Sequence, residues 1–358
     1  MTSYSGMLTR RLVLLPLALL LVMIVAVLDL RGVAQGDTFT VDKAVDATDA
    51  NPGDGVCDDG TGDCTLRAAI MEANASPGPD TINVPPNTYT LTLDSELTID
   101  EPLKLTGAGA DSTIIQAATE PGGVGFPIFN IIATDVTMSG VTIQYGSSGI
   151  VNIGATITLT DSAVSDNTGR GIDHYAGELT IINSTISGNT DSGISTGRSV
   201  LTVINSTINA NAGSGIFIGN SPIFVVNSTI SSNAGGGIFN AGGTAKLHST
   251  ILANNLSSKE CDVGDLGGFF SDGYNLVGDD SCGFSGPGDI VGVDPKLGPL
   301  QDNGGLTFTH ALVPGSPAID AGDDAACLAT DQRGVTRPQG TACDIGAYEL
   351  AICPPSQG

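Results

Sequence analysis

One short stretch of the chain combines side chain types that serve acid–base chemistry. It reads Arg170-Gly171-Ile172-Asp173-His174-Tyr175. A carboxylate or an imidazole can transfer a proton, and a guanidinium stabilises a developing anion. Those functions suit an elimination or a hydrolysis, and hydrolysis of a glycoside would require two carboxyl groups about 5–9 Å apart. We therefore take Arg170, Asp173 and His174 as candidate catalytic residues, with ordinary surface residues as the alternative.

A second group of polar side chains crowds a glycine-rich loop near the N-terminus. Oxygen ligands on a flexible loop suit Ca²⁺, although the spacing is not that of an EF-hand. The alternative is a solvated acidic loop that binds no metal. We expect no required cofactor and name Ca²⁺ as the ion to test, with the candidate ligands Asp49, Asn51, Asp54, Asp58, Asp59 and Asp63.

The chain has seven cysteines, which in an exported protein are typical of disulfides. Proximity in the sequence pairs Cys57 with Cys64, Cys261 with Cys282, and Cys327 with Cys343. Cys353 is then left over. A zinc site is the alternative, but the sequence has no Cys-x-x-Cys pair.

The elements that would position these groups come from an internal repeat. Segments such as Leu179–Ser184, Leu201–Ser206 and Ile223–Ser228 are similar and follow one another at steps of 22 residues. A period near 22 with short β-rich runs predicts the coils of a parallel β-helix. A leucine-rich repeat has a similar length, but it needs several leucines in each unit. A residue 22 positions after Asp173 is Ser195, so no acid stacks on that aspartate.

Asparagine recurs at two positions of the repeat. Asparagine tolerates left-handed turns, and its amide can bond to an asparagine in the next coil. We expect two asparagine ladders, formed by Asn183, Asn205 and Asn227 and by Asn167, Asn189, Asn211, Asn233 and Asn254. The first set also begins Asn-Ser-Thr glycosylation sequons, but residues buried in a ladder would not accept a glycan.

Composition narrows the functional class. There are 13 Lys and Arg against 38 Asp and Glu, so the net charge is −25. This charge disfavours partners that present phosphate, both nucleic acid and anionic lipid surfaces. Only 14% of residues are charged and the mean hydropathy is +0.19, which argues against disorder. Many glycines and few aromatic residues favour numerous short strands over packed helices.

The N-terminus has the pattern of a secretory leader. Arg10 and Arg11 precede an apolar run, and Gly32-Val33-Ala34 offers a small-x-small cleavage site. We assign residues 1–36 to a signal peptide, with an uncleaved membrane anchor as the alternative. A secreted or cell-surface location follows, with membrane contact only through this segment if it stays uncleaved.

The segment after the leader resembles a known domain. Residues 46–57 precede Cys64-Thr65-Leu66-Arg67-Ala68-Ala69, which is similar to the Cys-Ser-Leu-Arg-Glu-Ala core of the CSLREA domain. That family begins secreted bacterial proteins with right-handed β-helices. Leu66, Ala69, Ile70 and Ala73 share one face of a helix, so we expect a short helix that covers the first coil.

The C-terminal segment resembles the choice-of-anchor Q region that closes such proteins. The similar stretches are Asp302–Gly305, Thr309–Leu312, Gly315–Asp320, Asp331–Gly334 and Cys343–Glu349. The resemblance implies architecture and carries no established activity. Where larger family members continue into a sorting signal, this sequence stops nine residues after Glu349, so covalent anchoring is not implied.

Together these observations predict an all-β, right-handed parallel β-helix of the pectate-lyase-like superfamily with roughly eight or nine coils. The expected divisions are a cap over 37–80, the β-helix over 81–259, and further coils with an irregular, disulfide-containing cap over 260–358. The expected function is non-catalytic: binding of glycan or another surface component, or service as an extended structural or adhesive module. A polysaccharide lyase or glycoside hydrolase is the alternative.

Overall fold

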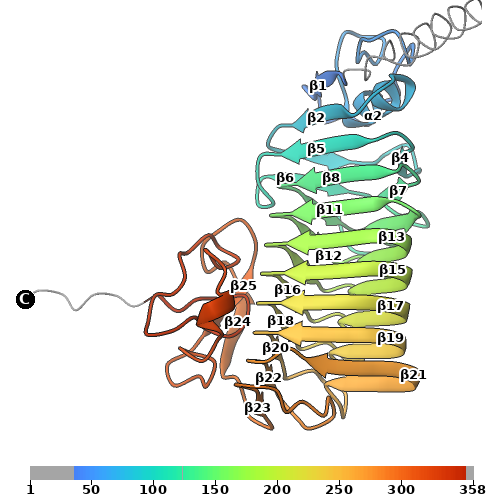
Figure 1. Cartoon of the computed structure of the whole chain (residues 1–358). Coiled ribbons are helices and arrows are strands. Elements are labelled where there is room, and N and C mark those ends of the chain that lie inside the picture. Colours follow the sequence, from blue (N-terminus) through green and yellow to red (C-terminus); the bar gives the residue numbers. More distant parts are fainter. Residues whose placement is uncertain (1–35, 123, 352–358) are drawn as a thin grey trace, which may run out of the picture.

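Each repeat unit folds into one coil because its apolar residues alternate with polar ones and point inward. A computed structural model describes residues 36–122 and 124–351. The predicted leader lies almost entirely outside these residues, as does Cys353. The coils stack into about nine turns of an elongated solenoid, as predicted (Figure 1). No helix in the described part of the chain is long and apolar enough to cross a membrane.

Two parallel sheets run the length of the solenoid. The larger, sheet A, has 13 strands, most of them in one row. That row is β1 (Thr38–Thr40), β2 (Asp80–Val84), β5 (Leu103–Gly107), β8 (Asp135–Ser139), β11 (Thr156–Thr160), β13 (Ile172–Ile182), β15 (Ile194–Ile204), β17 (Ile216–Val226), β19 (Ile238–His248) and β21 (Cys261–Ser271). The remaining strands of sheet A are β4 (Leu97–Ile99), β7 (Phe129–Ile131) and β10 (Ile150–Ile153).

The smaller sheet, sheet C, contributes one short strand to each coil and has ten strands. These are β3 (Asn87–Thr90), β6 (Thr113–Gln116), β9 (Thr142–Gln144), β12 (Ala163–Ser165), β14 (Thr185–Ser187), β16 (Thr207–Asn209), β18 (Thr229–Ser231), β20 (Ile251–Leu252), β22 (Leu276–Val277) and β23 (Ile290–Val291). The register across the central coils is 22 residues, which pairs Ile172 with Ile194 and Ile186 with Ile208.

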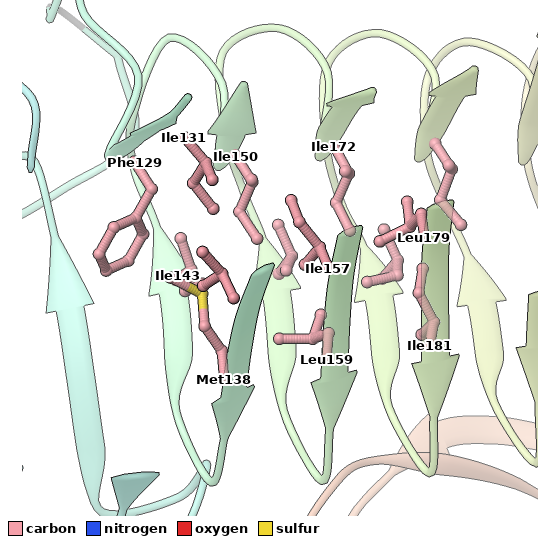
Figure 2. Packing of buried hydrophobic residues seen from close by; sticks show 14 of the residues in the cluster. Phe129, Ile131, Met138, Ile143, Ile150, Ile157, Leu159, Ile172, Leu179 and Ile181 are labelled. Atoms are coloured by element: carbon pink, nitrogen blue, oxygen red, sulfur yellow. The ribbon is translucent and has the colours of Figure 1, made fainter. Parts of the chain in front are cut away.

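The core is a column of aliphatic side chains between the two sheets. Ile150, Ile172 and Ile194 stack at one level, and each is fully buried. Figure 2 shows the same stacking for Leu159 and Ile181 in neighbouring coils. Because strands in a sheet lie about 4.8 Å apart, every inward side chain contacts its copy above and below. The repeat therefore produces a continuous, mainly aliphatic core, in which Phe129 is one of the few aromatic residues.

One asparagine ladder forms as predicted, except at its last member. Asn167, Asn189, Asn211 and Asn233 are buried, and each amide nitrogen donates to the next oxygen at 2.9 Å. The final acceptor is Asn255. The prediction of Asn254 was wrong by one residue, because the loop after β20 places Asn254 at the left-handed position (φ 64°) that precedes the ladder.

The second predicted ladder was wrong in its main part. Asn183, Asn205 and Asn227 all adopt left-handed turns, with φ of 47–50°. Only Asn183 bonds to its neighbour in the stack, Asp161, at 3.1 Å. The residue that follows each of these asparagines forms the ladder in their place: Ser184 N donates to Ser206 Oγ at 3.1 Å. Serine suits this position because its short side chain points inward at the turn and its Oγ reaches the backbone N of the adjacent coil.

Helix α2 (Leu66–Ala75) closes the N-terminal end of the solenoid. Its predicted apolar face is the one that is buried. Thr65 caps the helix by accepting from Ala68 N at 3.1 Å. Arg67 is buried against Asp46, with 2.6 Å between Nε and Oδ1. Glu72 accepts from Gly53 N at 2.6 Å, which ties the acidic loop to the helix. The Cys57–Cys64 disulfide closes the same loop, as proximity in the sequence predicted.

The C-terminal segment leaves the solenoid after β23 and folds back along its side (Figure 1). It contains the antiparallel pair β24 (Leu297–Gln301) and β25 (Thr309–Leu312) and the short helix η1 (Asp324–Ala326). We call residues 292–351 the lateral cap. Disulfides Cys261–Cys282 and Cys327–Cys343, both predicted, fix the last coil and the cap. Inside the cap, Arg337 and Glu349 form a fully buried ion pair.

The corrected ladder gives a direct stability test. Asn255→Ala removes the final acceptor for Asn233 and should lower the free energy of unfolding by about 2 kcal/mol, since buried polar groups lose their partners. Asn254→Gly should change it by less than about 0.5 kcal/mol, because glycine adopts the same left-handed turn freely. Urea unfolding of both variants measures the two effects. The reverse order would restore the original assignment.

Candidate functional site

The predicted catalytic group is divided between the two sides of β13. Ile172 points inward, so alternation sends Asp173 outward, His174 inward and Tyr175 outward. His174 is 1% exposed, whereas Asp173 lies on the surface. The structure therefore does not bring His174 together with Asp173, and His174 drops out of the candidate catalytic group. Successive residues of a strand face opposite sides of a sheet, and this constraint separates them.

His174 belongs to a polar column inside the solenoid. Its register neighbours are Asn152 in the preceding coil and Thr196 in the next. Nδ1 lies 2.9 Å from the Asn152 amide nitrogen and accepts its proton. Burial lowers the pKa of His174 from 6.5 to about 4. The imidazole is therefore neutral at physiological pH and has no route to a substrate on the surface.

On the outside of the same coil, Arg170 joins two carboxylates. Its Nη1 lies 2.8 Å from Asp173 Oδ1, and its Nε lies 3.4 Å from Asp191 Oδ2 in the next coil. All three side chains are partly exposed. Asp191 was missed because a step of 22 residues from Asp173 leads to Ser195 and passes over it. A loop residue just before the next strand reaches the same place, and its distance of 21 from Arg170 could have revealed it.

Next to this ionic group lies a surface of aromatic rings and glycine. Tyr175 is 44% exposed, and its ring covers Gly197, where an added Cβ would come within 2.9 Å of the ring. Phe217 and Phe239 stack with their ring centroids 5.4 Å apart. We call Tyr175, Gly197, Phe217 and Phe239 the aromatic face. It spans four consecutive strands of sheet A, from β13 to β19.

The acidic N-terminal loop uses its carboxylates to hold turns. Asp49 accepts from the backbone of Asn51 and Asp58, and Asp58 accepts from Gly60 and Gly62. Asp54 and Asp59 make the same kind of turn, and Asp63 pairs with Lys43 at 2.9 Å. Within residues 36–122 and 124–351, no group of three or more His, Cys, Asp or Glu side chains is arranged to hold a metal ion. Calcium binding there stays a prediction.

The lateral cap covers the face that presents the threonines of the three sequons. Gln332 donates to Thr185 Oγ1 at 2.9 Å and accepts from Thr207 Oγ1 at 2.6 Å. Ala347 N donates to Thr229 Oγ1 at 3.1 Å. These threonines therefore face the cap and not solvent. The covering segment follows these strands by more than 100 residues, so local periodicity could not reveal it.

A buried histidine and an apolar cluster complete the contact between cap and solenoid. His310 Nδ1 donates to Gly298 O at 2.7 Å, and Nε2 accepts from the Asn209 amide at 2.8 Å. Burial lowers the pKa of His310. Ile251 and Leu276 of the solenoid pack against Leu312 and Ile345 of the cap. The cap is thus a fixed part of the fold.

Comparison with known proteins agrees with this geometry. Residues 124–256 match the family model described as the right handed beta helix region. The fold is a right-handed parallel β-helix. The crystal structure of pectate lyase Pel9A is similar, with a TM-score of 0.58 and 16% identity over 89% of this chain and 97% of that chain. Among curated proteins, none matches the sequence.

Two further solved structures show a weaker likeness. The A-module of the Azotobacter vinelandii mannuronan C-5 epimerase AlgE6 has a TM-score of 0.35 and 15% identity over 68% of this chain and 93% of that chain. ORF18 of Geobacillus virus E2 has a TM-score of 0.36 and 17% identity over 75% and 65%. The likeness to Pel9A, at 16% identity, describes the fold alone.

The buried imidazole predicts a pH-dependent stability. Because its pKa is lower in the folded state, His174 favours folding fully above pH 6.5, and this contribution is lost as pH falls towards about 4. His174→Gln, which cannot be charged, should flatten the decline of Tm between those values. His310 adds a similar slope in both proteins, so the difference between the two pH profiles isolates His174. Parallel profiles would show that His174 is accessible and titrates normally.

Proposed function

We propose that this protein is exported and binds an extracellular polysaccharide through the aromatic face, without cleaving it. The observation that carries the proposal is the exposed Tyr175 ring lying over Gly197 beside the Arg170 ionic group. Sugar rings stack on exposed aromatic rings, and partly solvated carboxylates and guanidinium groups hydrogen-bond to sugar hydroxyls. The face extends along the solenoid axis, which suits a polymer better than a single sugar.

The spacing of the face supports an extended ligand. Neighbouring strands lie about 4.8 Å apart, so the four strands from β13, which carries Tyr175, to β19, which carries Phe239, cover about 14 Å. The strands are held by a continuous core, so these rings sit on a rigid support. Binding therefore orders few residues of the protein and loses little affinity to entropy.

The arrangement of the acid–base groups supports binding without cleavage. His174 faces the core with its pKa near 4, and Asp173 is engaged by Arg170. General catalysis requires a group within hydrogen-bond reach of the substrate. On the outer surface of this coil the titratable groups include Asp173 and Asp191, and one arginine links them.

Export is supported by the three disulfides and by the apolar leader.

The CSLREA resemblance also has a physical basis here. Thr65 caps α2, and Arg67 makes a buried ion pair, so the motif builds the N-terminal cap. The choice-of-anchor resemblance likewise lies in the lateral cap, where Gln332 contacts two coils. Both motifs serve architecture, which agrees with a binding or structural module.

One observation favours the alternative of a lyase or hydrolase. Asp173 and Asp191 come from different coils and both contact Arg170, so two carboxylates do meet on the surface. A pair of carboxyl groups is the usual equipment of glycoside hydrolysis. The overall similarity to pectate lyase Pel9A also makes this activity worth testing. A decisive experiment must therefore measure binding and turnover together.

Binding is tested by titrating the protein with pectin, alginate and neutral polysaccharides. Tyr175→Ala should weaken binding of the polymer about fivefold, measured as Kd, since stacking on one ring contributes about 1 kcal/mol. Phe224→Ala is the matched control, because this exposed ring lies on the other half of β17, away from the aromatic face. Equal losses in both variants, or none in either, would place the ligand elsewhere.

The same samples are assayed for unsaturated products and new reducing ends, with Ca²⁺ and with EDTA. We expect no turnover in the wild type under either condition. Product that disappears in Asp173→Asn or Asp191→Asn would contradict the non-catalytic proposal and establish the enzyme. Activity or binding that is lost only in EDTA would show that a divalent cation is required.

A further inference from the structure

The start of the folded chain lies against a buried carboxylate that has no cationic partner. Asp80, the first residue of β2, is 1% exposed. Its Oδ1 accepts from Asp37 N at 2.6 Å, and its Oδ2 has no hydrogen-bond partner among the described residues. A buried carboxylate of this kind is costly unless a positive charge balances it. Among the described residues, Asp80 therefore faces a deficit of positive charge.

The surroundings of Asp80 make the deficit larger. Burial raises its pKa, and the nearby acidic groups Asp37, Glu72 and Glu101 raise it further. None of the ion pairs found in residues 36–122 and 124–351 involves Asp80. A positive charge at Asp37 N would meet Oδ1 directly and could supply further protons to Oδ2.

Strand pairing fixes the backbone of Asp37 at this place. Thr81 N donates to Asp37 O at 2.8 Å, and β1 pairs in register with β2, with Thr38 opposite Thr81. The residue before it, Gly36, is tightly confined, because any Cβ there would overlap Pro79 O. Ala34 and Gly36 lie three positions and one position before Asp37, and they form a second small-x-small cleavage pattern two residues after Gly32-Val33-Ala34.

We propose that the chain is cut between Gly36 and Asp37, and that the new α-ammonium group of Asp37 forms an ion pair with Asp80. A leader peptidase adds water across the Gly36–Asp37 peptide bond, which leaves a carboxylate on Gly36 and an amine on Asp37. The amine takes up a proton from solvent, and the resulting ammonium replaces the amide N–H that donates to Asp80 Oδ1. Removal of the leader thereby supplies the missing charge and strengthens the first strand pair of sheet A.

The first test is the mass and N-terminal sequence of protein exported from the full chain. We expect Asp37 as the first residue. A mature chain that begins at any other position, or one that keeps the leader, would overturn the cleavage site.

The second test compares purified chains that begin at Asp37 and at Ala34. They differ in whether residue 37 carries an ammonium or an amide. The Asp37 chain should have a Tm about 2–4 °C higher, and Asp80→Asn should abolish that difference. Glu101→Gln, which changes an exposed neighbouring acid, should leave it intact. Equal Tm values, or a difference that persists in Asp80→Asn, would contradict the ion pair.

A third measurement does not depend on how the variants fold. The pH dependence of acylation of the α-amine in the Asp37 chain reports its pKa. We expect a value above the ordinary range of about 7.7–8.0, because the carboxylate of Asp80 stabilises the charged form. A pKa within that range would show that the N-terminus does not pair with Asp80.

Discussion

The stacking of each coil on its own copy is the constraint on which the remaining structure depends. A step of 22 residues places identical side chains above one another, so a favourable contact in one coil is repeated in the next. The asparagine ladder shows this most clearly, because each buried amide satisfies a backbone group and another amide at once. Glycine is required beside it: a Cβ at Gly193 would come within 2.7 Å of the Asn211 amide.

Because stacking acts only between neighbouring coils, the ends of the solenoid and its lateral faces are covered by other parts of the chain. Stacking satisfies a coil only where a neighbour exists, so the N-terminal end requires α2 and the buried Arg67–Asp46 pair. The lateral cap covers the sequon threonines, whose side chains point away from the core of the solenoid. It uses the regular spacing of those threonines, because one glutamine can contact two coils at once. A repeated surface is thus also a repeated docking site.

Surface chemistry arises where the coils depart from identity. The inward positions of β13 and β15 include His174 and Thr196, whereas the outward ones include Asp173, Tyr175 and Gly197. Tyr175 occupies the space that the glycine leaves open one coil later, so the aromatic face depends on two different residues at one register position. A strictly uniform repeat would not produce such a site. Recognition on this solenoid therefore comes from its irregular coils, while rigidity comes from the regular ones.

The sequence by itself determined the solenoid, because periodicity and alternation are local properties that one chain displays in full. It also indicated α2 and the three disulfides, since those partners are close in sequence. Tertiary structure alone decided what depends on distant segments or on the exact register. It places His174 inside the solenoid and Asp191 beside Arg170. It also makes Asn255, and not Asn254, the last member of the asparagine ladder, and it places the cap over Thr185 and Thr207. Such contacts follow from three-dimensional packing, and no spacing rule in the sequence encodes them.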